Sequence, residues 1–301
     1  MHSISDIKQG VTKGDFLTLA KAISWIENNG EGTTSFLQEL LPNSIPIIGI
    51  TGPPGAGKST LINALITSWV NEAKKVAVLS VDPSSPFHHG AILGDRIRMK
   101  DWYLHPQVYI RSLAARGHLG GVNSAMLSLT TLMQSVGFDY IILETVGVGQ
   151  SEVEIASLAD TTVVVLVPEA GDEVQMMKSG LMEIANVFVV NKSDRPNAQT
   201  FVNHLNQMIL DNASATATAP QVISTIATEK IGIPELQLAI EQHQESLNIG
   251  GNKKEIFLNK VMQLILAHKM NQVEVNKIKT KLELEYNKSN FNIFKFAQEF
   301  Y

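Results

Sequence analysis

The sequence predicts an α/β fold: a three-layer domain with a mostly parallel sheet between helices. Short runs rich in β-branched residues alternate along the chain with longer stretches of helical periodicity. The runs are nearly continuous in apolar residues, which is typical of strands covered on both faces. We expect strands at residues 45–50, 76–81, 108–111, 140–143, 162–167, 187–190 and 221–224.

Helical segments flank this alternating region on both sides. Asp15 can cap a helix that carries apolar residues at helical spacing, and a second short helix is expected at residues 35–41. No Gly or Pro occurs from Asn252 to the end, and Phe257, Val261 and Leu264 share one helical face. We expect an N-terminal helical extension at 1–44, the main domain at 45–250, and a C-terminal helical arm at 251–301.

Composition limits the classes of function. The 301 residues are 44% hydrophobic, which is enough for a full core, and the net charge of -5 gives no electrostatic reason to expect nucleic acid or an anionic membrane. The absence of cysteine excludes disulfides, thiolate metal sites and a cysteine nucleophile. No apolar run is long enough for a secretory signal or a membrane span. We therefore expect a soluble, cytoplasmic protein with no nucleic-acid or membrane partner.

A phosphate-binding loop follows the first expected strand. The residues are Gly52, Pro53, Pro54, Gly55, Ala56, Gly57, Lys58, Ser59 and then Thr60, and they match G-x-x-x-x-G-K-[ST]. The glycines allow backbone N–H groups to turn toward phosphates, and the helix that follows adds the partial positive charge of its N-terminus. Lys58 can reach the β- and γ-phosphates. A chance match is the alternative, but the position between a strand and a helix is the one that the chemistry requires.

A second motif indicates which base is bound. Asn191, Lys192, Ser193 and Asp194 follow the strand at 187–190. The Asp194 carboxylate can accept hydrogen bonds from N1–H and the exocyclic amine of guanine, whereas adenine offers neither donor. A weaker base-supporting loop is expected at Ser224, Thr225 and Ile226. An ordinary polar loop after a strand is the alternative for each.

Acidic residues at the ends of strands suggest a magnesium site. Asp82 and Glu144 each end an expected strand, and carboxylates there face the ligand crevice of a parallel sheet. With the Ser59 hydroxyl they can hold Mg²⁺, directly or through water, and Lys58, Asp82 and Glu144 are the candidate catalytic residues. Gly147 can donate its N–H to the γ-phosphate. Capping of a following helix is the alternative role for both acids.

The segment 87–100 between these acids has the character of a switch. Asp95 can complete the magnesium shell, and Arg96 or Arg98 can stabilise charge on the γ-phosphate; solvated loop charges are the alternative. The neighbouring His88 and His89 lack a third clustered ligand, which argues against a metal site. Gln150 can orient the attacking water or simply cap a helix.

Taken together, the motifs resemble those of one family. GITGPPGAGKST, VDPSS, ILGDRIRM, YIRS, LGG, ETVGVGQSE, PEAGDEVQ and NKSD occur in the order seen in the GTPases that chaperone methylmalonyl-CoA mutase, formerly called the arginine/lysine transport system ATPase or kinase family. The resemblance covers nearly the whole chain. It implies a P-loop GTPase domain that binds GTP or GDP with Mg²⁺, and a homodimer joined by the C-terminal arm.

The resemblance also implies a partner, an adenosylcobalamin-dependent acyl-CoA mutase whose cofactor loading, protection and reactivation the GTPase governs. Residues 171–175 and Lys178 match a mobile loop that relays the nucleotide state to the mutase. Three features depart from the family pattern: Thr225 stands where Ala is usual, residues 114–118 differ, and the tail from Asn252 is poorly matched. A metal-insertion GTPase and a transport-associated kinase are the alternative functions.

Overall fold

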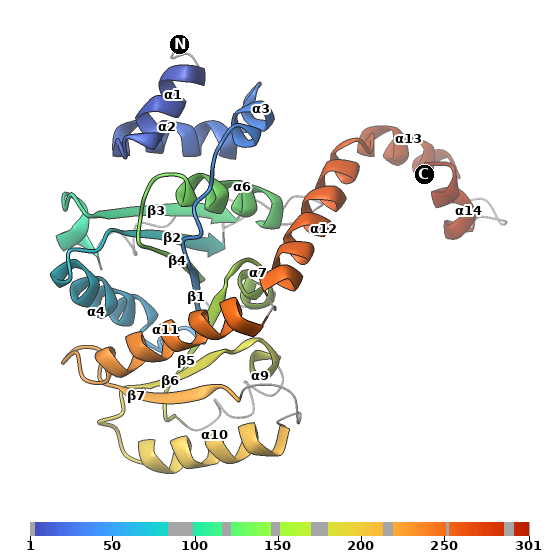
Figure 1. Cartoon of the computed structure of the whole chain (residues 1–301). Helices are drawn as coiled ribbons and strands as arrows, with labels where there is room; N and C mark the ends of the chain where they lie inside the picture. Colours follow the sequence, from blue (N-terminus) through green and yellow to red (C-terminus); the bar gives the residue numbers. More distant parts are fainter. Residues whose placement is uncertain are drawn as a thin grey trace.

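The computed structural model describes residues 4–83, 99–115, 122–145, 151–169, 180–212, 219–250, 253–285 and 292–300. Seven parallel strands form one sheet in the order β3-β2-β4-β1-β5-β6-β7 (Figure 1). The strands are β1 (Ile47–Thr51), β2 (Val76–Pro83), β3 (Val108–Ala115), β4 (Tyr140–Thr145), β5 (Thr161–Leu166), β6 (Val187–Asn191) and β7 (Gln221–Thr225). The predicted α/β class, the parallel sheet and all seven predicted strands are therefore confirmed.

Helices occur before, between and after the strands. They are α1 (Ile4–Thr12), α2 (Phe16–Glu27), α3 (Thr33–Gln38), α4 (Lys58–Asn71), the short 3-10 helix η1 (Lys100–Trp102), α6 (Val122–Gln134), α7 (Ser151–Leu158), α9 (Leu181–Ile184), α10 (Ala198–Asn212), α11 (Ile233–Gly250), α12 (Lys253–Asn271), α13 (Val275–Glu285) and α14 (Ile293–Gln298). As predicted, Asp15 caps α2, because its carboxylate accepts from the backbone N–H groups of Leu17 and Thr18.

Strand alternation divides the core between the two faces of the sheet. Val76 and Val78 of β2 pack on the face covered by α4 and α11, while Ala77 and Leu79 pack on the face covered by α2, α6 and α7. A third cluster lies under α9 and α10. Both faces of the strands are thus buried, which explains why their sequences are apolar without alternation.

The β3 strand is longer than the sequence predicts. The sequence predicts an end at Arg111, but the strand continues to Ala115, because it pairs with β2 in register from Val76↔Val108 to Pro83↔Ala115. Pairing with a long neighbour extends a strand beyond the residues whose own pattern indicates it. The short helix expected at 35–41 begins earlier, at Thr33, directly after the left-handed Gly32.

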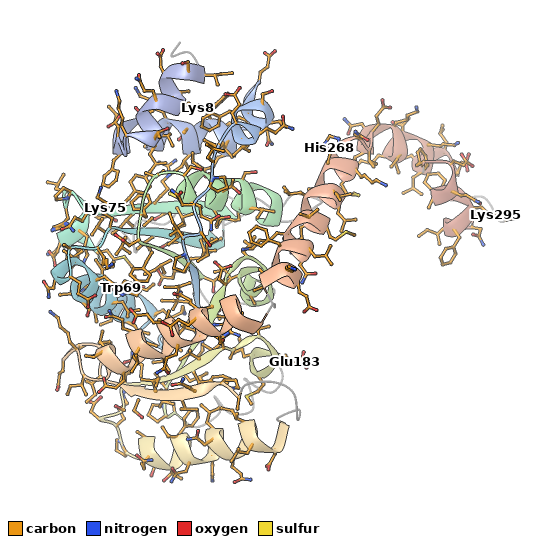
Figure 2. All side chains as sticks on the ribbon, in the orientation of Figure 1. Lys8, Trp69, Lys75, Glu183, His268 and Lys295 are labelled. Atoms are coloured by element: carbon orange, nitrogen blue, oxygen red, sulfur yellow. The ribbon has the colours of Figure 1, made fainter. Side chains whose placement is uncertain are left out.

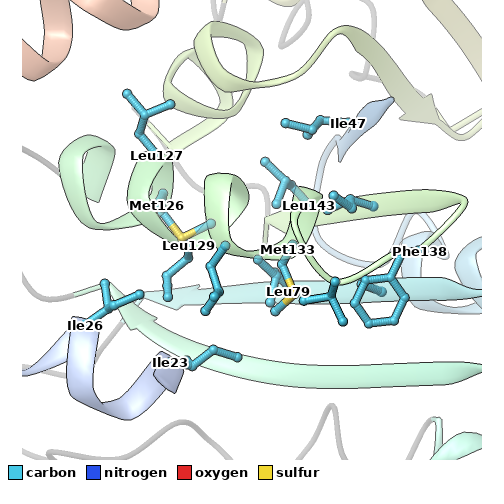
Figure 3. Packing of buried hydrophobic residues seen from close by; sticks show 14 of the residues in the cluster. Ile23, Ile26, Ile47, Leu79, Met126, Leu127, Leu129, Met133, Phe138 and Leu143 are labelled. Atoms are coloured by element: carbon cyan, nitrogen blue, oxygen red, sulfur yellow. The ribbon is translucent and has the colours of Figure 1, made fainter. Parts of the chain in front are cut away.

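The N-terminal helices share a core with the sheet. Ile23 and Ile26 of α2 lie against Leu129 and neighbouring side chains of α6 (Figure 3). Phe16 packs edge-on against Tyr109 of β3 with ring centroids 5.3 Å apart, and burial raises the pKa of the Tyr109 hydroxyl to about 12. Arg111 of β3 also donates to Glu27, with 3.1 Å between the nitrogen and the carboxylate oxygen. Side chains on both sides of the boundary predicted at residue 44 thus pack together. The division into an N-terminal extension, a main domain and a C-terminal arm stays a prediction.

The C-terminal helices lead away from the sheet. Figure 2 shows His268 and Lys295 out along α12 to α14, apart from Trp69 in the body of the domain. The base of α12 is tied to the body by Lys260, whose ammonium lies 3.4 Å from the Asp160 carboxylate. Within the described residues, no helix is long and apolar enough to cross a membrane.

If the N-terminal helices belong to the same cooperative unit, a cavity at Ile23 will destabilise the whole domain. Ile23→Ala should lower the free energy of unfolding by about 2–5 kcal/mol in a single transition. Leu17→Ala on the same helix, 67% exposed, is the control and should change it by less than about 0.5 kcal/mol. Urea denaturation followed by circular dichroism and tryptophan fluorescence measures both. Equal midpoints for the two variants would contradict the shared core.

Candidate nucleotide site

The phosphate loop joins β1 to α4 at the carboxyl edge of the sheet. Gly52, Gly55 and Gly57 have φ angles of +138°, +82° and +90°, which favour glycine. Space also requires glycine at two of these positions. A Cβ at Gly52 would collide with the backbone carbonyl of Val165 in β5, and one at Gly57 with the side-chain amide of Asn191. The loop is therefore fitted closely to two neighbouring strands.

Lys58 begins α4 and is buried in the loop. Its ammonium donates to the carbonyl oxygens of Gly52, at 2.7 Å, and Pro53, at 3.0 Å. The lysine thus folds back over the loop in which phosphates would lie. A phosphate oxygen can replace these carbonyls as the acceptor, so the predicted role of Lys58 is consistent with its position.

Ser59 and Glu144 lie together, as a shared magnesium site requires. The Ser59 hydroxyl donates to Oε1 of Glu144 at 2.8 Å, and both residues are buried. Hydroxyl and carboxylate oxygens are the hard ligands that Mg²⁺ prefers, and Mg²⁺ usually keeps several waters beside them. The donors present therefore fit the ion. The arrangement also accounts for a buried carboxylate, which is costly without hydrogen bonds.

Two threonines link the start of the phosphate loop to the end of β4. The Thr51 and Thr145 hydroxyls lie 2.9 Å apart and are hydrogen-bonded, and both are buried. Thr51 immediately precedes Gly52, and Thr145 immediately follows Glu144. This hydrogen bond keeps together the end of β1, which leads into the phosphate loop, and the end of β4, which carries the candidate metal ligand Glu144.

Asn191 joins the phosphate loop to the base-binding loops. Its amide nitrogen donates to the Ala56 carbonyl at 2.9 Å. Its amide oxygen accepts from the Thr225 hydroxyl at 3.1 Å and from the Ala227 backbone N–H at 3.2 Å. Thr225 therefore uses its hydroxyl to hold Asn191.

Lys192 and Asp194 follow on the same loop. Lys192, in the left-handed region at φ +57°, donates from its ammonium to the Gly55 carbonyl at 2.7 Å. The Ser193 N–H donates to the Thr225 carbonyl at 3.0 Å, which sets the two base loops side by side. Asp194 is exposed beside them, open to a ligand. The structure thus brings the predicted residues 191–194 and 224–226 together against the phosphate loop.

Several predicted site residues lie outside the described residues, wholly or in their side chains. Asp82 lies on β2, but its side chain is outside the described residues. Asp95, Gly147 and Gln150 lie outside them altogether, as do the remaining predictions at 88–89, 96–98 and 171–178. Among the residues that are described, no group of three or more His, Asp or Glu is arranged to hold a metal ion. The roles proposed for these residues stay predictions.

Some contributors were missed from the sequence. Ser80 of β2 donates to Oε2 of Glu144 at 3.0 Å, and Thr51, Thr145 and Ala227 make the contacts described above. A polar Ser80 inside an otherwise apolar strand was a usable signal. Its partner could not be read from the chain, because β2 and β4 are neighbours only in the folded sheet.

Comparison with known proteins finds relatives that match most of the chain. A family model described as "Methylmalonyl Co-A mutase-associated GTPase MeaB" matches residues 19–282. A protein of Pyrococcus abyssi that carries a GTPase name is 43% identical over 257 residues, which are 84% of this chain and 79% of that one. GTPase ArgK of Escherichia coli is 36% identical over 260 residues, 81% of this chain and 77% of its own.

One more distant relative and one solved structure extend the comparison. The mouse protein named methylmalonic aciduria type A homolog, mitochondrial, is 32% identical over 262 residues, 80% of this chain and 63% of its own. The crystal structure of a LAO/AO transport system kinase has a TM-score of 0.71 at 24% identity and covers 98% of this chain and 95% of that one. At that identity the structure supports the fold alone.

The contact between Gly57 and Asn191 can be tested without a ligand. Gly57→Ala should destabilise the nucleotide-free protein by about 1–3 kcal/mol more than Gly55→Ala, because only the former crowds the Asn191 amide. The two glycines share the left-handed backbone, so the strain common to both cancels in the comparison. Urea denaturation measures the difference. The same loss in both variants would show that Asn191 does not pack as described.

Proposed function

Because the chain belongs to the family of methylmalonyl-CoA mutase-associated GTPases named MeaB, we propose that it is a GTP-hydrolysing chaperone for an adenosylcobalamin-dependent acyl-CoA mutase. In this proposal it gates cofactor loading and protects or reactivates the mutase. The chain's identity as a P-loop GTPase rests on the family and the fold. The family description and the name of the mouse relative support methylmalonyl-CoA mutase as the partner.

The observation that carries GTP recognition is the packing of the Asn191 loop against the phosphate loop. The Asn191 and Lys192 side chains donate to the carbonyls of Ala56 and Gly55. A nucleotide with its phosphates in the loop therefore has its base near residues 193–194. There the Asp194 carboxylate accepts from guanine N1–H and the exocyclic amine, whereas adenine would leave it without those donors.

Hydrolysis in this proposal depends mainly on positioning and charge. Lys58 transfers its hydrogen bonds from the loop carbonyls to the β- and γ-phosphate oxygens. Ser59 and Glu144, with Asp82, would hold Mg²⁺, which neutralises charge on the phosphates when bound. No described residue is placed as a base that orients water. We infer slow turnover by the chain alone and faster turnover once the mutase orders the site.

The arm offers a surface for a second copy. Eight large apolar side chains of α12 are at least 41% exposed, Phe257 and Leu258 among them at 58% and 59%. Large exposed apolar patches mark interaction surfaces. We assign this surface to a homodimer joined by residues 251–301, and the cytoplasm as the compartment stays part of the proposal.

The two alternatives have less support in the chain. Insertion of nickel or another such metal requires thiolates or clustered imidazoles, but the sequence has no cysteine and its eight histidines are scattered apart from one pair. A transport-associated kinase needs an acceptor site, and the sequence provides no feature that indicates one. Stoichiometric tight nickel binding would favour the first alternative, and phosphorylation of a periplasmic binding protein the second.

The proposed recognition of guanine predicts that replacing one carboxylate oxygen of Asp194 by an amide nitrogen changes which nucleotide is preferred. In Asp194→Asn the amide can still accept from N1–H but meets the exocyclic amine with a donor, so GTP affinity should fall roughly 10- to 100-fold. Xanthosine triphosphate carries a carbonyl in place of that amine, so it should bind the variant better than GTP. Fluorescence competition binding measures GTP, XTP and ATP. Asp101→Asn, exposed on η1, is the charge-matched control. An undiminished preference for GTP in Asp194→Asn would contradict the proposal that Asp194 binds the guanine base.

The partner assignment predicts a nucleotide-dependent complex. Size-exclusion chromatography with light scattering should show the chain alone at twice its 32.9 kDa mass and, with methylmalonyl-CoA mutase, a complex whose amount differs between a GTP analogue and GDP. GTP turnover should rise in the complex. Lys58→Ala, which loses the phosphate contact, should lose the nucleotide dependence. Absence of a complex in every nucleotide state would contradict the chaperone proposal. Equal GTP turnover by the chain alone and with the mutase would contradict the predicted stimulation.

A further inference from the structure

Ser80 is a buried hydroxyl at the centre of the sheet. It lies on β2 directly opposite Glu144 of β4 in the parallel register, and its side chain is 2% exposed. Its Oγ donates to Oε2 of Glu144 at 3.0 Å. A serine hydroxyl in such a place is costly unless it is hydrogen-bonded, and alanine would fill the same position in a strand without that cost.

The two oxygens of Glu144 have different partners. Oε1 accepts from Ser59 of the phosphate loop, and Oε2 accepts from Ser80 of the sheet. Ser59 sits on the first turn of α4, and its hydroxyl would turn from Glu144 toward a bound metal ion. Ser80 is in the middle of a paired strand, so its position does not depend on the nucleotide.

We propose that Ser80 is a positioning residue that holds the Glu144 carboxylate in place when Ser59 leaves it for Mg²⁺. The inference rests on the proposed function, since it needs Mg²⁺ to bind with the nucleotide at Ser59 and Glu144. The Ser80 bond keeps Oε2 fixed, and Oε1 is then aimed at the ion or its waters. Without the Ser80 hydroxyl, Oε2 lacks this hydrogen bond when the metal ion arrives.

Strand geometry places Ser80 on the correct face for this role. Side chains two residues apart in a strand point to the same face, and Val76 and Val78 pack in the cluster that contains Leu61 and Ile62 of α4. Ser80 continues that row toward the carboxyl edge of the sheet. It therefore lies under the N-terminal end of α4, where the hydroxyl of Ser59 contacts the same carboxylate.

The test is the Mg²⁺ dependence of nucleotide binding in Ser80→Ala. The variant removes one oxygen and keeps the strand, so the protein should fold. Binding of a fluorescent GDP analogue to the protein is followed as Mg²⁺ is added. The affinity of the protein for the same analogue is also measured in EDTA. Since a hydrogen bond to a charged group is lost, we expect the half-saturating Mg²⁺ concentration to rise about tenfold, with the affinity in EDTA within about twofold of wild type.

A matched control is available at Thr130 of α6. Its hydroxyl is also buried, 1% exposed, and donates to the Leu127 carbonyl at 3.0 Å. Thr130→Val removes a buried hydroxyl outside the candidate site and should leave the Mg²⁺ midpoint unchanged. Thermal unfolding of both variants without nucleotide shows whether any loss is general.

The outcomes separate this inference from the proposed function. An unchanged Mg²⁺ midpoint in Ser80→Ala, in a wild type that does respond to Mg²⁺, overturns the role of Ser80 alone. An equal loss of affinity in EDTA and in Mg²⁺ shows a general structural role and overturns it too. If wild-type binding of the nucleotide shows no response to Mg²⁺, the metal site of the proposed function fails together with the inference.

Discussion

The side-chain amide of Asn191, at the end of β6, joins its own loop to two others through buried hydrogen bonds. It bonds Ala56 in the loop after β1, and Thr225 and Ala227 at the end of β7 and in the loop after it. Each loop follows a different strand, and parallel strands deliver their carboxyl ends to one edge of the sheet. The amide bonds fix the distance between the loop that cradles phosphates and the loop that carries Asp194. In the proposed function, binding of a whole guanine nucleotide depends on that distance, because one loop binds the phosphates and the other binds the base.

In the nucleotide site, groups that a ligand would use are hydrogen-bonded to other groups of the protein. Lys58 donates to carbonyls of its own loop, and Ser59 donates to Glu144. These contacts supply hydrogen-bond partners to buried polar groups, which would be costly to leave unpaired. In the proposed function, nucleotide binding exchanges one set of hydrogen bonds for another, and the exchange at Ser59 would link the metal ion to Glu144 of β4.

The sequence predicts the components well and their cross-strand contacts poorly. The phosphate loop, the Asp15 cap and all seven strands were predictable because each depends on neighbours within a few residues. The contacts of Ser80 with Glu144 and of Thr51 with Thr145 depend on the order β2-β4-β1, in which strands distant along the chain become neighbours. The shared core of α2 and α6 depends likewise on how the N-terminal helices dock, which periodicity does not specify.

A crystal structure with Mg²⁺ and a non-hydrolysable GTP analogue tests the central claim most directly. The account predicts that Lys58 leaves the Gly52 carbonyl for the phosphates, that Ser59 leaves Glu144 for the metal, and that Asp194 bonds the guanine while the Asn191 contacts persist. A bound analogue with Lys58 still 2.7 Å from the Gly52 oxygen, and guanine out of reach of Asp194, would contradict it.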